Sequence, residues 1–224
     1  MAGEHLGLAE RIDRVVELIE ASTIGSAVPP TVKARARMRA IELLDAGGSE
    51  NGTGGIALLT CAAEILCEVA VDLAARPRDA RGLIDEIEVG VGIPRVALGR
   101  EVLRTPSLPE LSSDVALEVQ LALLLTFAEV DATSLWMLSP DGELEHISHA
   151  GALDLGSPGS SRAARALLMD SGRVNRPPRS EAGIRLERWL HPVAALVAHG
   201  EPVGADHRAL LLDAAVPVLG AILE

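Results

Sequence analysis

The side chains that could do chemistry are few and lie far apart along this chain. His146 and His149 form an HxxH pair in the segment ELEHISHAG, which we expect to be a strand. Successive side chains of a strand alternate between its two faces, so a spacing of three points the two rings to opposite sides. They cannot share a metal without a bulge. We therefore expect surface or edge histidines, with an axial haem ligand as the less favoured alternative.

The two cysteines, Cys61 and Cys67, are six residues apart in an apolar segment that we expect to be helical. On a helix of 3.6 residues per turn this spacing corresponds to a rotation of about 240°, so the thiols face different ways. We expect two buried, reduced thiols rather than a disulfide or a metal pair. The other histidines are scattered, and the sequence predicts no metal site and no cofactor.

The segment GSPGSS at 156–161 is a glycine and serine loop before a predicted helix, and serine is a favoured helix cap. It has neither the GxxxxGK[ST] spacing of a phosphate-binding loop nor the GxSxG pattern of a nucleophile elbow. A nucleophile also needs a base and an orienting group beside it, and the sequence identifies no such set. We therefore expect the protein not to be an enzyme, with an unrecognised type of enzyme as the alternative.

Charge disfavours nucleic acid as a partner. The chain has 32 Asp and Glu residues against 20 Lys and Arg, a net charge of −12, which opposes a phosphate backbone. In the segment KARARMR, a helix would place Lys33 and Arg37 on one face and Arg35 and Arg39 on another. We expect both pairs to bind nearby acidic side chains rather than a single groove of nucleic acid.

The N-terminus has no basic region followed by an apolar stretch, and no uninterrupted apolar run is long enough to span a bilayer. We expect a cytoplasmic protein with no membrane partner. Aromatic residues are nearly absent, so the core must consist of Leu, Val, Ile and Ala.

The first half of the chain predicts an all-helical domain, 1–108. Apolar residues at spacings of three and four predict an amphipathic helix over 4–21. Proline and glycine signals delimit a second helix over 30–46, and a third over 55–75 is apolar around most of its circumference, so it should be buried. Residues 77–108 predict two further helices on either side of a glycine turn at 90–92.

The second half, 109–224, predicts an α+β domain. A long helix over 109–130 precedes two strands, 132–139 and 143–151, joined by the turn signal PDG. A short helix follows Ser160 or Ser161 and ends by Gly172. Two more strands, 184–190 and 192–200, precede a terminal helix over 206–224.

The helices 109–130 and 206–224 are apolar on every face over part of their length, so each needs a second surface to cover it. Another subunit often supplies such a surface, and we predict a homodimer. The residues expected at this interface are Leu117, Leu121, Leu124, Leu211, Val218, Leu219 and Ile222.

The order of elements from LLTFAEVDATSLWMLSPDGELEHISHAG (124–151) to PVAALVAHGEPVGADHRALLLDAAVPVLGAILE (192–224) resembles the GAF domain family of signalling proteins. The resemblance covers about half the chain. It implies an antiparallel sheet of five or six strands, a ligand pocket on one face and helices on the other that commonly pair between subunits. The connection 152–183 is short for this family, which implies a small, closed or vestigial pocket. The cyclic-nucleotide signature of the family is not seen, and neither cysteine lies where a bilin would attach.

Within this GAF-like fold we expect any ligand to be small and either apolar or anionic. It would lie between the sheet face that carries Trp136 and Leu138 and the connection that follows, where Arg173, Arg176 and Arg179 offer forked donors. The alternative for these arginines is a solvated loop. Strand alternation leaves open whether the Trp136 face or the opposite face, with Leu135 and Met137, is turned to the pocket.

Two functions follow from these observations. The first is a non-enzymatic sensory or regulatory input module of a bacterial signalling protein, such as a histidine kinase or a transcription regulator. Its output domain or partner signalling protein would lie outside this sequence. The second is a GAF-like protein-interaction scaffold that holds no ligand.

Overall fold

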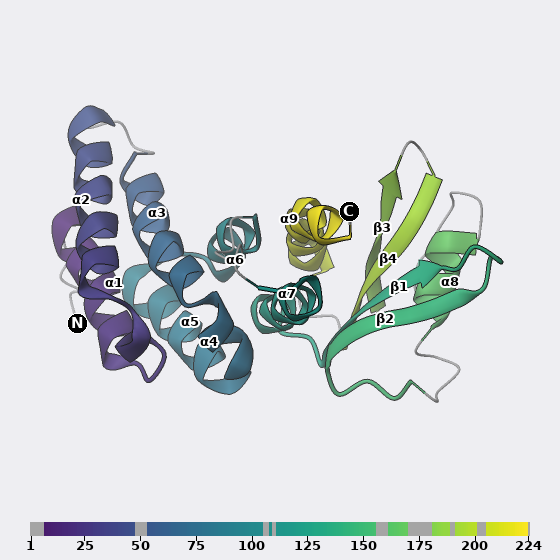
Figure 1. Cartoon of the computed structure of the whole chain (residues 1–224). Coiled ribbons are helices and arrows are strands. Elements are labelled where there is room, and N and C mark those ends of the chain that lie inside the picture. Colours follow the sequence, from purple (N-terminus) through teal and green to yellow (C-terminus); the bar gives the residue numbers. More distant parts are fainter. Residues whose placement is uncertain are drawn as a thin grey trace. The chain divides into compact units, whose positions relative to one another are not determined.

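A computed structural model of the chain describes residues 7–47, 53–104, 108, 111–155, 161–169, 181–188, 191–200 and 205–223. The chain is an α+β protein whose contacts divide it into two units, Met1–Ser107 and Leu108–Glu224 (Figure 1). The boundary expected from the sequence, after residue 108, lies one residue from this division.

The described part of the N-terminal unit is helical. The predicted third helix is two helices, because the backbone departs from helical geometry at Val69 (φ −108°, ψ 24°). The elements are α1 (Leu8–Ala21), a short 3₁₀ turn η1 (Gly25–Ala27), α2 (Pro30–Gly47), α3 (Thr53–Glu68), α4 (Ala70–Ala75), α5 (Pro77–Val91) and α6 (Arg95–Arg104).

Local chemistry sets the ends of these helices. At the start of α1, the backbone N–H of Gly7 donates to Glu10 Oε2 at 2.7 Å, which satisfies one of the otherwise unpaired amide groups. At the end of α5, Gly92 adopts the left-handed conformation (φ 77°) and its N–H bonds to the Glu88 carbonyl. Arg11 of α1 donates to the Val91 carbonyl at 3.0 Å, so α1 and α5 are tied together at this end.

The predicted pairing of the KARARMR basic residues with nearby acidic side chains is confirmed. On one face of α2, Lys33 pairs with Glu20 at 3.0 Å and Arg37 pairs with Asp13 at 2.7 Å, both acids of α1. On the other face, Arg35 and Arg39 both reach Glu64 of α3. Helical geometry therefore sends alternate basic residues to two different neighbouring helices.

The C-terminal unit contains a four-stranded antiparallel sheet in its described residues, whereas the family resemblance implied five or six strands. The strand order is β2-β1-β4-β3, so β1 and β4 are the central strands. The elements are α7 (Ser113–Ala128), β1 (Ala132–Leu138), β2 (Leu144–Gly151), α8 (Arg162–Met169), β3 (Glu181–Arg188), β4 (His191–His199) and α9 (Ala205–Ile222).

Helices cover both faces of this sheet (Figure 1). On the face packed by α7 and α9, the hydroxyl of buried Thr133 donates to the Leu121 carbonyl at 2.8 Å. On the opposite face, Trp136 packs against α8. The choice that strand alternation left open is thereby made: Thr133 and Leu135 are turned to the two long helices, and Trp136 to the connection after β2.

The apolar helices find their second surface within the chain. Helix α7 packs against α9, β1 and β2, and α9 also packs against β3 and β4. Five residues expected at a subunit interface are at most 5% exposed in the single chain, so they are not available on its surface: Leu117, Leu121, Leu124, Leu211 and Leu219. Only Val218 and Ile222 of that set remain half-buried.

The predicted turn between β1 and β2 is present. Ser139 and Glu143 bond across it, with the Ser139 N–H donating to the Glu143 carbonyl at 2.8 Å, and Gly142 is in the left-handed region (φ 80°). Gly151, at the end of β2, has a similar φ of 86°. A Cβ on Gly151 would overlap the Asp131 carbonyl and the Leu125 side chain, whereas nothing lies within 4 Å of a Cβ on Gly142.

These two glycines predict different costs for the same substitution. Gly142→Ala should lower the free energy of unfolding by about 1 kcal/mol, because alanine is strained at positive φ. Gly151→Ala adds a steric overlap and should cost about 3 kcal/mol or more. Urea unfolding followed by circular dichroism measures both, and equal costs would contradict the close packing of Gly151.

Candidate functional site

Helix α8 occupies the sheet face on which we expected a ligand. Trp136 is only 5% exposed and belongs to an apolar cluster with side chains of α8 and β4, and Leu138 is partly buried against the same cluster. The residues that α8 contributes are Ala163, Ala164, Leu167 and Leu168. The three arginines that we expected beside this face, Arg173, Arg176 and Arg179, lie outside the described residues.

A buried polar network lies on the same face of the sheet. The indole N–H of Trp136 donates to Ser134 Oγ at 2.8 Å, and this oxygen lies 2.7 Å from His199 Nε2. The histidine nitrogen accepts the serine proton or donates to the serine oxygen according to its tautomer. The network joins β1 to the end of β4, two segments 65 residues apart in sequence.

A serine beside a histidine is the chemical core of a nucleophile and its general base. Ser134 is 0% exposed and His199 is 9% exposed, so no substrate carbonyl can reach the serine oxygen in this arrangement. What the pair does here is satisfy buried polar groups, each of which would otherwise carry a desolvation penalty.

Removing the serine hydroxyl should therefore destabilise the fold. Ser134→Ala leaves the Trp136 N–H without its acceptor and takes one partner from His199, at a cost of about 1–3 kcal/mol. Ser139→Ala, which removes an exposed hydroxyl that accepts from the Glu143 N–H, should change stability by less than about 0.5 kcal/mol. Equal effects in urea unfolding would show that the network contributes nothing specific.

The prediction that His146 and His149 point apart is wrong, because β2 contains a bulge. Ser134 pairs with His149, but Trp136 pairs with His146, and the pairing register shifts between these positions. One extra residue on β2 restores both imidazoles to the Trp136 face. The His146 ring meets the Trp136 ring edge-on at 5.0 Å, and the two imidazole centroids are 5.1 Å apart.

This environment lowers the pKa of His146 below its ordinary value of 6.5. Burial is the main cause, because it penalises the charged imidazolium. The neighbouring His149 lowers the pKa further, while a hydrogen bond with the backbone of Ser148 acts in the opposite direction.

Stability should consequently fall with acidification in a way that depends on His146. Since its pKa is lower in the folded chain, the unfolded chain binds the proton first, so the stability from neutral His146 is complete above about pH 6.5 and is lost as the pH falls through the folded pKa. His146→Gln should flatten the slope of unfolding free energy between pH 7.5 and pH 5. His207→Gln, at an exposed position on α9, is the control and should keep it. A slope that persists unchanged in His146→Gln would refute this assignment.

The cysteines behave as expected. Cys61 and Cys67 are both buried, and neither is part of a disulfide. Burial, followed by the Glu64 carboxylate, raises the pKa of the Cys61 thiol to about 12, so it stays protonated and unreactive at neutral pH. Among the residues that the structure describes, no three His, Cys, Asp or Glu side chains gather where they could hold a metal ion.

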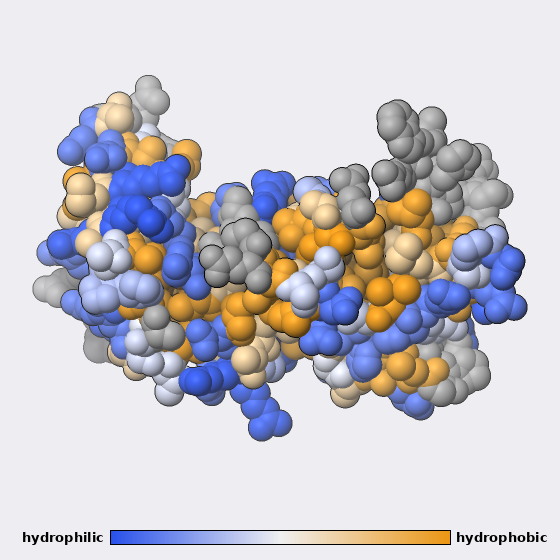
Figure 2. Space-filling model, in the orientation of Figure 1, coloured by the Kyte–Doolittle hydropathy of each residue, from blue (hydrophilic) through white to orange (hydrophobic). Residues whose placement is uncertain are grey.

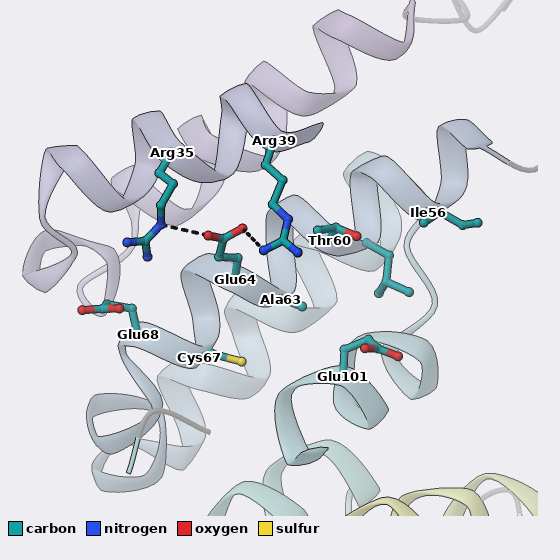
Figure 3. A pocket seen from close by; sticks show the side chains of 10 residues that line it. Arg35, Arg39, Ile56, Thr60, Ala63, Glu64, Cys67, Glu68 and Glu101 are labelled. Carbon is teal, nitrogen blue, oxygen red and sulfur yellow. Dashed lines mark hydrogen bonds and ion pairs between the residues drawn. The ribbon is translucent and has the colours of Figure 1, made fainter. Parts of the chain in front are cut away.

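The N-terminal unit carries a groove of about 560 Å³ (Figure 3). Its floor is one stripe of α3 that includes Ile56, Leu59, Ala63 and Cys67. The α2 wall carries Arg35 and Arg39, and the remaining lining residues are Thr60, Glu64, Glu68 and Glu101.

Charges in this groove are only partly matched. Arg35 Nε lies 2.9 Å from Glu64 Oε1. Arg39 Nη1 lies 3.8 Å from the other oxygen of Glu64, which is too far for a hydrogen bond, and that oxygen is buried without a hydrogen-bond partner. Two arginines therefore share one carboxylate, and both remain more than 60% exposed.

Sequence reasoning missed three of these features. The Ser134–His199 contact depends on the register between β1 and β4, which no local pattern encodes. The bulge leaves no clear signal, since ELEHISHAG reads as an ordinary strand. For the groove, the sequence predicted a buried third helix, and most of its apolar side chains are buried, but Ile56 near its start is 59% exposed.

No protein-family model matches the sequence, and no match was found among curated proteins. In the part of the chain that the structure describes, no helix has the length and apolar character needed to cross a membrane.

Proposed function

We propose that this chain is a non-enzymatic regulatory module of bacterial signalling, and that its C-terminal unit is a GAF-like protein-interaction scaffold that holds no small ligand. The order of elements in this unit, with a long helix, a hairpin, a short helix, two strands and a terminal helix, supports the GAF-like assignment.

The packing of α8 on the sheet is the observation that favours a scaffold over a ligand sensor. Ala164 is 0% exposed and Ala163 is 3% exposed, and with such small side chains the helix axis can approach the strands closely. Leu167 and Leu168 then cover Trp136 and Val197, where the resemblance would place a ligand. A ligand there would have to displace these leucines, each worth about 1.5–3 kcal/mol of burial.

The outward face of α9 supports self-association. Leu210, Pro217 and Ala221 are exposed at spacings of seven and four, and so share one face of the helix. Figure 2 shows an apolar area over α9 in this view. The half-buried Val218 and Ile222 lie on the same helix. We propose that the homodimer forms through this outward face of α9, in place of the buried leucines.

Native mass spectrometry tests both parts of the proposal. We expect a dimer at micromolar protein concentration, with no retained small molecule. Leu210→Glu with Ala221→Glu should give a monomer, because two carboxylates would be buried in the interface. Val89→Glu, at an 88% exposed apolar position on α5, is the matched control and should remain a dimer.

The two parts of the proposal, the absence of a ligand and the homodimer, can be contradicted separately. A bound small molecule in the wild-type spectrum would favour the ligand-sensing alternative, and Arg173→Ala with Arg176→Ala would then test the expected anion contacts. If the wild-type chain is a monomer at micromolar concentration, the proposed homodimer is contradicted.

A further inference from the structure

We propose that the groove between α2, α3 and α6 binds an amphipathic helix of a partner protein, one with an acidic edge along its apolar stripe. This inference rests on the proposed role of the chain as an interaction module, and it assigns the partner site to the N-terminal unit.

The shape of the groove favours a helix over a compact ligand. Its floor runs along α3 from Ile56 to Glu68, a rise of about 18 Å or three turns. Its volume alone would suit a small molecule, but such ligands are usually enclosed over most of their surface. Here Ile56 is 59% exposed at one end, and Arg35 and Arg39 of the α2 wall are more than 60% exposed, while Ala63 and Cys67 lie at the bottom of the groove with 6% and 7% of their surface exposed.

The floor provides the spacing that an amphipathic helix needs. Leu59, Ala63 and Cys67 repeat every four residues, with Ile56 one turn before them. Apolar side chains at i, i+3 or i+4 and i+7 of a partner helix would lie along this stripe. The partner would then add one helix to the helical unit, and its apolar side chains would cover Ile56.

The two walls of the groove differ in charge, and this difference sets the orientation of the partner helix. The α2 wall contributes only Arg35 and Arg39, which share the carboxylate of Glu64 of α3, so the positive charge of the groove lies on this wall although the whole lining has three carboxylates against two arginines. Glu101 lies on the α6 side, and Glu68 lies at the far end of the floor. An acidic edge on the partner therefore belongs beside α2. Arg39 is the main donor because its contact with Glu64 is the looser of the two.

A displayed peptide library provides the probe. Peptides of about 18 residues, with apolar residues fixed at helical i, i+3, i+4, i+7 and i+11 positions and all others random, are selected on the immobilised full chain. We expect enriched peptides with Asp or Glu along one edge. Labelled copies should bind Ile56→Glu roughly tenfold or more weakly by fluorescence anisotropy. Met38→Glu, on α2 outside the groove lining and 62% exposed, is the matched control and should bind normally.

A charge exchange tests the orientation. The peptide with Lys in place of its acidic residues should bind Arg39→Glu better than the wild-type chain. If Ile56→Glu lowers the melting temperature, its weaker binding could come from lost stability. The charge exchange at the exposed Arg39 then decides whether the peptide binds in the groove. The inference is overturned if no peptide is enriched, if Ile56→Glu binds like the wild type, or if the exchange has no effect. Native mass spectrometry concerns the other unit, so the scaffold proposal and this inference fail independently.

Discussion

Strand β1 has hydrogen-bonded neighbours on both edges and buried side chains on both faces. A strand in this position must satisfy every polar side chain it carries from within the protein. Thr133 does so on one face through the Leu121 carbonyl, and Ser134 does so on the other through Trp136 and His199. The two helical layers of the C-terminal unit follow from this strand, since each face needs its own apolar cover.

The same constraint keeps the Ser–His pair away from solvent. A Ser–His pair with good hydrogen-bond geometry is present, but it lies in the interior because β1 is central. The histidines of β2 are at the edge of the sheet, so His146 is only half-buried and His149 is exposed. Depth in the sheet thus decides access to a ligand: the Ser–His pair, which has good hydrogen-bond geometry, is the least accessible of these groups.

The N-terminal unit follows a different principle. Its helices are held by apolar burial, and ion pairs between partly exposed groups, each worth about 0–1 kcal/mol, tie α2 to α1 and α3. Weak pairs of this kind can be exchanged for contacts with a partner at little cost. The shared carboxylate of Glu64 illustrates this, because Arg39 holds it loosely and retains donors for another acid.

The sequence by itself determined the local structure of this protein. Apolar periodicity and the turn residues located most of the helices and the hairpin, because these depend on interactions between near neighbours along the chain. Helical geometry likewise predicted the two directions of the basic residues on α2. Most apolar side chains of α3 are buried as predicted, but Ile56 is exposed, since the composition of a helix does not say whether a neighbour covers each part of its surface.

Tertiary structure alone decided what depends on register and depth. The bulge in β2 turned His149 to the face of His146, the alignment of β1 with β4 joined Ser134 to His199, and α8 covered Trp136. Each is a contact between segments whose pairing is chosen by the packing of the whole unit, so a shift of one residue would reverse every face. The same long-range packing buried Leu124 and Leu219 within the chain, where the sequence predicted a second subunit.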